Sequence, residues 1–276
     1  MVKLATGQTL RSAERMLDVL SVFSTTEPAL TARQIADRLN LAQSTLSRIL
    51  EVLTRRNFIS YDETRGVYTP HFEIIRLAEA VVSNNDLISA TRIPMDRLLE
   101  KSGESNQLAV LSGDQCVFVN RRVSNQVVKV FSPLGQSLPC WDGRAAGQAL
   151  IAWCSASKID EILPEDSAWR RIGSAISGRA EFLELLAQVR QLGYAINNEF
   201  SAPDVWAVAA PVRDHTREVV AAITVPVLAS RITSQERILE LAEMVCDAAQ
   251  AASANLFYSG DYQTGQTCGS GSNRPA

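Results

Sequence analysis

The sequence has few of the residues on which metal and covalent chemistry depend. It contains only 2 histidines, His71 and His215, in unrelated contexts. Its 5 cysteines are scattered with no C-x-x-C spacing, at positions 116, 140, 154, 246 and 268. Zinc sites and Cys–His nucleophiles need such residues in clusters, so neither is expected, and the thiols are expected to be reduced small apolar groups.

Signals for nucleotide binding and membrane insertion are also absent. The chain has no P-loop and no G-x-G-x-x-G motif, so we expect no cofactor and no metal. It begins with no signal peptide and has no apolar run of the roughly 20 residues that span a bilayer. These absences favour a cytoplasmic protein without a membrane partner.

Length and charge distribution predict two domains with different partners. A chain of 276 residues is typical of two domains. Residues 1–70 carry 9 Lys and Arg against 7 Asp and Glu, net +2, whereas the remainder carries net −5, in agreement with the total of −3. A mildly basic head on an acidic body suits specific, salt-sensitive DNA binding better than a general grip on polyanions.

The segment Thr31 to Arg56, TARQIADRLNLAQSTLSRILEVLTRR, predicts two short helices joined by a tight turn. Leu46, Ile49, Leu50 and Leu53 recur at helical spacing and form the inward face of the second helix. The opposite face offers hydroxyl, amide and guanidinium groups suited to phosphates and base edges in a major groove: Gln43, Ser44, Thr45, Ser47 and Arg48. Arg33, on the first helix, is expected to meet the flanking DNA backbone.

Flanking signals complete a winged helix-turn-helix. Thr31 and Gln34 fit a capping box, and Asn40 suits the left-handed turn between the helices. Residues 11–23 predict a third helix of the small core. Two β-rich runs, 58–61 and 67–69, surround a polar turn and predict a wing with Arg65 at its tip. Two alternatives stay open: the helix pair is structural or binds protein, and Ser44 caps its own helix.

The second half predicts an α+β domain. Residues 71–85 form a linker helix, and a helix over 86–101 is interrupted near Pro94. Strands grouped at both ends around central helices indicate an antiparallel sheet domain at 86–257: strands at 107–111, 116–120, 127–131, 193–196, 205–212 and 219–225, and helices at 143–153, 180–192 and 234–256. The Gly- and Ser-rich residues 258–276 predict a disordered tail.

The blocks SAERMLDVLSVF, LTARQIADRLNLAQSTLSRILEVLTRRNFI and VYTP stand in the head, followed by GQSLPCWDGRAAGQALIAW, RQLGYAINNEF and AVAAPVRDHTREVVAAITV in the body. Through these blocks the chain resembles the isocitrate-lyase-regulator (IclR) family of bacterial transcription factors, from about Arg11 to Leu256. The resemblance implies a winged helix-turn-helix head, a linker helix and an effector-binding body with a GAF-like or profilin-like sheet. It also implies dimers, often paired into tetramers, that respond to small carboxylates or aromatic compounds.

The resemblance further implies an effector pocket between the sheet and the loop and helix start near Ala145. By position the pocket comprises Val128, Phe131, Ala145, Ala146, Asn197, Ala207, Thr224 and Pro226. The chain departs from the family pattern at four positions: Asn197 replaces a common Asp, Ala207 a Cys, Gln148 a Lys and Pro226 a Ser. These departures make the pocket less polar and favour a bulkier or aromatic ligand.

Structural roles compete with each pocket assignment. Core packing is the commoner role of a single aromatic residue, and Asn197 and Thr224 suit hydrogen bonds to backbone at a sheet end. Arg121 and Arg122 can pair with a ligand carboxylate, but adjacent strand residues point to opposite faces, so at most one faces a cavity.

The sequence therefore predicts a DNA-binding transcriptional regulator, a repressor or an activator, controlled by a small organic acid or aromatic catabolite. Its partners are an inverted-repeat operator in double-stranded DNA, the effector, and a second copy of itself in a dimer or tetramer. The alternative is a ligand-binding or hydrolytic enzyme whose N-terminal helices only mediate dimerisation, although neither histidine has an evident catalytic partner.

Overall fold

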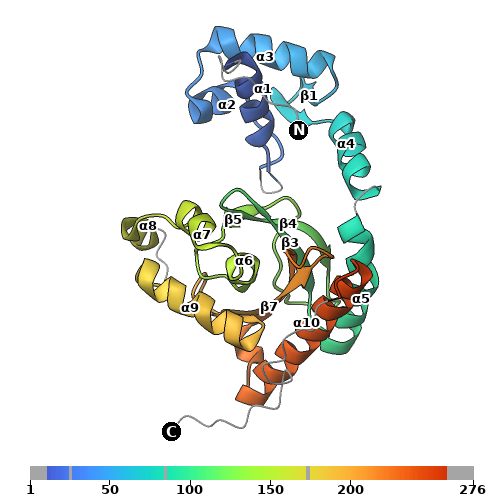
Figure 1. Ribbon diagram of the computed structural model, residues 1–276. Helices are drawn as coiled ribbons and strands as arrows, with labels where there is room; N and C mark the ends of the chain where they lie inside the picture. The colour runs from blue at the N-terminus through green and yellow to red at the C-terminus, as the bar shows by residue number, and fades with distance from the viewer. Residues whose placement is uncertain (1–10, 25–26, 84–85, 172–174, 260–276) are drawn as a thin grey trace. The chain divides into compact units, whose positions relative to one another are not determined.

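The chain divides into two compact units, residues 1–85 and 86–276, which are described separately (Figure 1). The computed structural model describes residues 11–24, 27–83, 86–171 and 175–259. The predicted disordered tail lies outside the described residues from 260 onward.

The first unit is a winged helix-turn-helix, as the sequence predicts. Its helices are α1 (Arg11–Ser21), α2 (Ala32–Leu39) and α3 (Gln43–Arg55), followed by strands β1 (Ile59–Asp62) and β2 (Val67–Pro70) and by the linker helix α4 (Phe72–Ser83). The capping box forms at the start of α2: the Gln34 amide donates to Thr31 Oγ1 over 3.2 Å, and the Thr31 amide donates to Gln34 Oε1 over 2.8 Å. Asn40 ends α2 with φ 49° and ψ 48°, the expected left-handed turn.

The small core of this unit lies where the three helices meet the wing. Val19 of α1, Ile35 of α2 and Leu46 of α3 are fully buried, and Ile59 of β1 packs against them. Leu30 exchanges two backbone hydrogen bonds with Tyr68 of β2, at 3.0 and 2.7 Å. These bonds tie the wing to the start of the helix-turn-helix.

The second unit is α+β, with one antiparallel sheet of order β5-β4-β3-β8-β7-β6. The strands are β3 (Asn106–Ser112), β4 (Gln115–Arg122), β5 (Ser137–Pro139), β6 (Ala195–Asn198), β7 (Val205–Arg213) and β8 (Val219–Leu228). The helices are α5 (Asp86–Ser102), α6 (Ala145–Ile151), α7 (Ala156–Ile162), α8 (Asp166–Arg171), α9 (Arg179–Leu192) and α10 (Gln235–Asn255), with the short 3-10 helix η1 (Ala229–Arg231).

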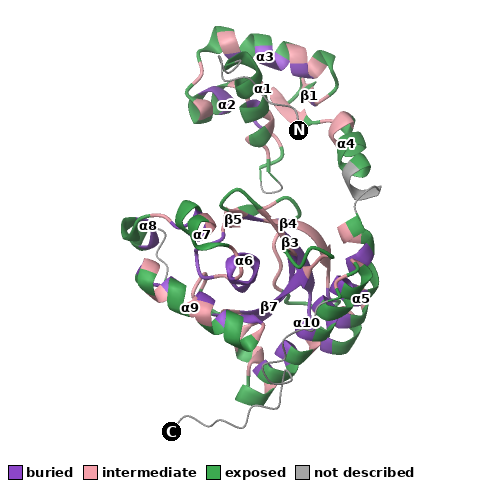
Figure 2. Ribbon diagram, in the orientation of Figure 1, coloured by how far each residue is buried: buried purple, intermediate pink, exposed green. Residues whose placement is uncertain are grey.

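Helices cover both faces of this sheet. Successive residues of a strand point to opposite faces, and accordingly Ala209 belongs to the core under α6 and α9, whereas Val208 and Ala210 belong to the core under α5 and α10. The sheet curls around α6 (Figure 1), every residue of which is buried (Figure 2). Because α6 is enclosed, its start is held firmly at the inner face of the sheet.

Two local predictions were wrong. Residues 127–131 form no strand, and the third strand of the β-meander is β5 instead. Helix α5 is not interrupted at Pro94 but continues through it. The sequence reading also missed α7 and α8, whose short apolar patterns of 7 and 6 residues are too brief to show helical periodicity.

Candidate nucleic-acid interface and ligand cavity

The outer face of α3 is open to solvent. Leu46, Ile49, Leu50 and Leu53 are buried on the inner face, and Gln43, Ser44, Ser47 and Arg48 are exposed, with Thr45 half-buried. The helix begins after Ala42, which is its N-cap in an extended conformation and makes no side-chain cap bond. The alternative that Ser44 caps its own helix was therefore wrong, because Ser44 lies inside the helix.

Two further exposed arginines of the first unit flank α3 in the sequence, one before it and one after it. Arg33 on α2 lies 3.8 Å from Asp37, one turn away. Arg65 stands in the wing turn, where the Asp62 carboxylate accepts from the amides of Thr64 and Arg65 over 3.0 and 3.1 Å. In the part of the chain that the structure describes, neither Arg48 nor Arg65 forms an ion pair, so both charges are available to a phosphate.

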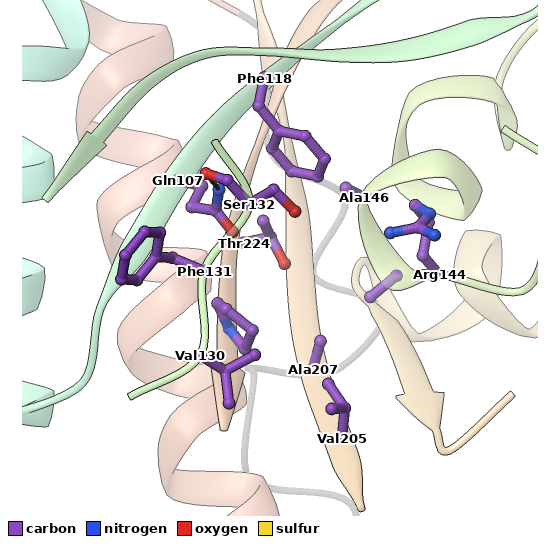
Figure 3. A pocket seen from close by; sticks show the side chains of 12 residues that line it. Gln107, Phe118, Val130, Phe131, Ser132, Arg144, Ala146, Val205, Ala207 and Thr224 are labelled. Atoms are coloured by element: carbon purple, nitrogen blue, oxygen red, sulfur yellow. Dashed lines mark hydrogen bonds between the residues drawn. The ribbon is translucent and has the colours of Figure 1, made fainter. Parts of the chain in front are cut away.

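The second unit holds a cavity of about 90 Å³ between the sheet, the start of α6 and the loop before β5 (Figure 3). This volume is several times that of a single water site, so the cavity is large enough for a small organic molecule. The lining residues come from six places in the chain: Gln107, Phe118, Val130, Phe131, Ser132, Arg144, Ala145, Ala146, Val205, Ala207, Thr224 and Pro226.

Most of the cavity wall is apolar, and its polar groups gather at two places. Figure 3 shows Gln107, Ser132 and Thr224 together on one side and Arg144 across from them. Gln107 Nε2 donates to the Ser132 carbonyl over 2.9 Å, and Thr224 Oγ1 donates to the Val208 carbonyl over 3.1 Å. The Thr224 hydroxyl therefore keeps lone pairs that can accept a bond from a ligand.

Arg144 is the charged residue of the lining. Its Nε donates to both carboxylate oxygens of Asp142, over 2.9 and 2.8 Å, and the Asp142 side chain is 9% exposed. Because Asp142 already balances the guanidinium, the cavity does not demand a strongly charged ligand. The arrangement suits an apolar or aromatic body with one polar or acidic end.

The structure brings six of the eight predicted pocket residues together at this cavity: Phe131, Ala145, Ala146, Ala207, Thr224 and Pro226. Val128 lies outside the lining and is 57% exposed. Asn197 is buried, but its Oδ1 accepts from the amides of Phe200 and Ser201 over 2.9 and 3.3 Å, which is the backbone role weighed for it above.

Sequence reasoning did not single out the other six lining residues, Gln107, Phe118, Val130, Ser132, Arg144 and Val205. For Gln107 and Val205 the available signal was that alternate residues of a strand share one face of the sheet. Of the two adjacent arginines, Arg121 lies over the Phe131 ring at 4.7 Å from its centre, and Arg122 pairs with Asp96.

Other site types find no support among the described residues. No group of three or more His, Cys, Asp or Glu side chains in these ranges is placed to hold a metal ion. None of the helices that the structure describes combines the length and apolar character needed to cross a membrane.

A winged helix with an open polar face and a second unit enclosing a small cavity define a DNA-binding regulator that senses a small molecule. Two family models match the chain: the IclR helix-turn-helix domain over residues 12–63 and the bacterial transcriptional regulator IclR C-terminal domain over residues 79–254. The chain belongs to the IclR family of transcriptional regulators.

Proteins with similar sequences are also HTH-type transcriptional regulators. The HTH-type transcriptional regulator XynR of Escherichia coli K12 is 26% identical over 90% of this chain and 98% of its own length. BhcR of Paracoccus denitrificans is 28% identical, covering 90% of this chain and 88% of its own. The repressor AllR of E. coli K12 is 26% identical over 89% and 90%.

Solved structures share the fold. A putative IclR regulator from Silicibacter sp. TM1040 matches with a TM-score of 0.77 at 20% identity, over 90% of this chain and 97% of that one. An IclR homologue from Microbacterium hydrocarbonoxydans, in complex with 4-hydroxybenzoate, matches with a TM-score of 0.74 at 21% identity, over 89% and 99%. These likenesses agree with the fold described above.

Proposed function

We propose that the chain reads an inverted-repeat operator as a homodimer and changes its DNA binding when a small aromatic or organic acid enters the cavity of the second unit. The observation that carries the proposal is the cavity, with its apolar wall and its two separate polar ends. We assign residues 1–70 to DNA reading, 71–85 to the linker and 86–257 to effector binding and oligomerisation.

The DNA half of the proposal rests on the exposed face of α3. Arg48 and Gln43 are suited to base edges, and Ser44, Thr45 and Ser47 to groove and phosphate contacts. Arg33 and Arg65 are assigned to flanking phosphates. A two-fold dimer places two such helices about one helical turn apart on the duplex, which is why the operator is expected to be an inverted repeat.

Exposed apolar side chains of the first unit support the dimer. Leu17 of α1 is 64% exposed, and Phe72 and Ile75 of α4 are 72% and 62% exposed. Apolar side chains of this size left exposed to solvent are available to a partner. A second copy of the chain is the partner that a palindromic operator requires; pairing of dimers into tetramers follows the family resemblance.

The effector half is supported by the cavity lining and by the relative that binds 4-hydroxybenzoate. An aromatic acid presents a flat apolar ring to Phe118, Phe131 and Ala207 and one carboxylate to Arg144 or to the Gln107 side. We expect binding without turnover, in the cytoplasm where the DNA lies, because no nucleophile–base pair lines the cavity in the described ranges.

The test is selection of sheared genomic DNA on the purified full-length protein, followed by sequencing. Enrichment of one inverted repeat, with an affinity that falls steeply as salt rises, is the expected result. Thermal shift with 4-hydroxybenzoate and a panel of aromatic and aliphatic acids then tests the effector class. An absence of any enriched sequence, with and without these acids, contradicts the regulator proposal.

A further inference from the structure

One wall of the ligand cavity is a segment held largely by side-chain hydrogen bonds. We name residues 123–136, between β4 and β5, the strap. All of its residues are described, and none belongs to a helix or strand. Val130, Phe131 and Ser132 line the cavity, whereas Val127 is 98% exposed.

Hydrogen bonds hold both ends of the strap. At its start the Ser124 hydroxyl donates to the Gly103 carbonyl over 2.7 Å. Towards its end Gln107 Nε2 donates to the Ser132 carbonyl, and the Gly135 amide donates to the backbone of β4 over 2.8 Å. The middle of the strap, around Val128, lies between these two anchors.

Arg231 holds the middle of the strap from a distant part of the chain. Its Nη2 donates to the Val128 carbonyl, and its Nη1 donates to Glu104 Oε2 over 2.8 Å. Arg231 ends η1, the turn that connects β8 to α10. One guanidinium therefore joins the end of β8, the loop after α5 and the middle of the strap.

The burial of Glu104 makes this bridge firm. Its side chain is 6% exposed, and that of Arg231 is 28% exposed. Glu104 Oε1 also accepts from Gln126 Nε2 over 3.3 Å, but that amide is neutral and does not balance the charge. A buried carboxylate without a counter-charge is costly, so Glu104 keeps Arg231 in place. The Val128 carbonyl then accepts a charge-assisted bond, which is stronger than one between neutral groups.

We propose that Arg231 is a positioning residue for effector binding: by joining Glu104 to Val128 it holds the strap closed over the cavity. Opening the strap, which breaks the bond to Val128, is the step that lets a ligand in and out. The role of strap opening in ligand exchange rests on the proposed function. The closing role of Arg231 concerns the protein without ligand and is tested without one.

The test is limited trypsin digestion of the full-length protein, followed by mass spectrometry. Lys129, next to Val128, provides a cleavage site within the strap itself, and cleavage of a folded protein follows the population of the locally open form. Arg231→Ala is expected to speed cleavage after Lys129 about tenfold, the typical effect of losing a hydrogen bond to a charged group. A rate equal to that of the unchanged protein overturns the proposal.

Arg237→Ala is the matched control. Arg237 lies on α10 and donates to Glu240 and to the Ser102 carbonyl, neither of which belongs to the strap. Its removal is expected to leave cleavage after Lys129 unchanged. Faster cleavage at all sites within residues 86–259 in Arg231→Ala would show general destabilisation and would also overturn the proposal.

Two further variants separate the strap contact from the ion pair. Glu104→Gln removes the buried charge and keeps the Val128 bond, so cleavage after Lys129 should rise less than in Arg231→Ala. The double variant Glu104→Gln with Arg231→Ala leaves no unpaired buried charge. If Arg231→Ala alone does not fold, the double variant replaces it in the trypsin test, and the same faster cleavage after Lys129 is expected.

Stopped-flow binding of 4-hydroxybenzoate connects the strap to ligand exchange. In Arg231→Ala both association and dissociation are expected to be faster than in Arg237→Ala. Equal rates in the two variants, with binding intact, overturn the role of the strap in ligand entry. If 4-hydroxybenzoate binds to no variant while the trypsin difference stands, 4-hydroxybenzoate is not the effector, and the closing role of Arg231 holds.

Discussion

Asn255, near the end of α10, donates its Nδ2 to the carbonyl of Ala90 on α5 over 2.8 Å. In a regular helix that carbonyl accepts from the amide four residues later, but residue 94 is proline and has no N–H. Asn255 therefore replaces the bond that Pro94 removes, which explains how α5 continues through its proline. The same bond links the first and last helices of the second unit.

This relationship predicts an interaction between two substitutions. Asn255→Ala leaves the Ala90 carbonyl without a partner and should lower the free energy of unfolding by about 1–3 kcal/mol. In a Pro94→Ala background the new amide bonds to Ala90, so the same Asn255→Ala change should cost clearly less. Chemical denaturation of the four proteins gives the coupling as a double-mutant cycle. Equal costs in both backgrounds would contradict the replacement.

Arg48→Ala is expected to weaken specific operator binding by roughly 1–3 kcal/mol, because it removes the groove contact proposed for the middle of α3. Fluorescence anisotropy with the selected operator measures the change. Arg92→Ala, which removes another exposed charge, from α5 in the second unit, is the control and should have little effect. An unchanged footprint and affinity for Arg48→Ala would remove Arg48 from the interface.

The wing makes a separate prediction about salt. Arg65→Ala should weaken binding to all DNA sequences alike and lower the slope of log K against log salt by about one, as expected for one lost phosphate contact. Titrations at several salt concentrations, on the operator and on unrelated DNA, measure the slope. A loss confined to the operator would instead indicate that Arg65 reads bases in the minor groove.

Phe131→Ala should weaken effector binding by about 1–3 kcal/mol, because an aromatic side chain is removed from the cavity wall. Isothermal titration with the acid found by thermal shift is the measurement. Phe257→Ala removes the same side chain from an exposed site, 83% accessible, and should change nothing. An unaltered affinity in Phe131→Ala would place the ligand elsewhere.

The two buried thiols of the sheet core should be inert at neutral pH. Burial raises the pKa of Cys116 to about 12 from its usual 9.0, and burial likewise raises the pKa of Cys140. At pH 8 only about one Cys116 in ten thousand is a thiolate. Alkylation of the folded protein should therefore spare both residues, whereas the half-buried Cys154 reacts first among the described cysteines.

The raised pKa values of these thiols also make the free energy of unfolding depend on pH. The folded state keeps these protons and the unfolded chain loses them near pH 9, so the stabilising difference is fully present below pH 9. The free energy of unfolding should decrease as the pH rises from about 9 towards 12. Cys116→Ala should make that decrease shallower. A pH-independent stability in this range would contradict the burial of the thiols.

Much of the first unit could be predicted from its sequence because its signals are local. Thr31 with Gln34 specifies a helix start, Asn40 specifies a left-handed turn, and Leu46 and Leu50 mark the buried face of α3. Each of these features depends on residues within one or two helical turns. The helix-turn-helix therefore emerges without knowledge of distant contacts.

The second unit was less predictable where distant contacts decide the conformation. The apolar run 127–131 suggested a strand, yet no neighbouring strand pairs with it, and Arg231 holds it instead. Pro94 suggested a break in α5 because the compensating Asn255 lies on another helix. The six pocket residues found by resemblance mark the cavity, but Gln107 and Arg144 join it only through the folded sheet.

The order of strands in the sheet limits when the second unit can complete its fold during synthesis. β3, the first strand of the second unit, hydrogen-bonds to β8, the last, and Gln107 pairs with Thr224. Until β8 has been synthesised, the edge of β3 that pairs with it therefore has no partner strand. The winged helix, whose contacts are short in sequence, can fold while the sensor is still being synthesised. The DNA-reading head of this regulator can therefore form before its sensor is complete.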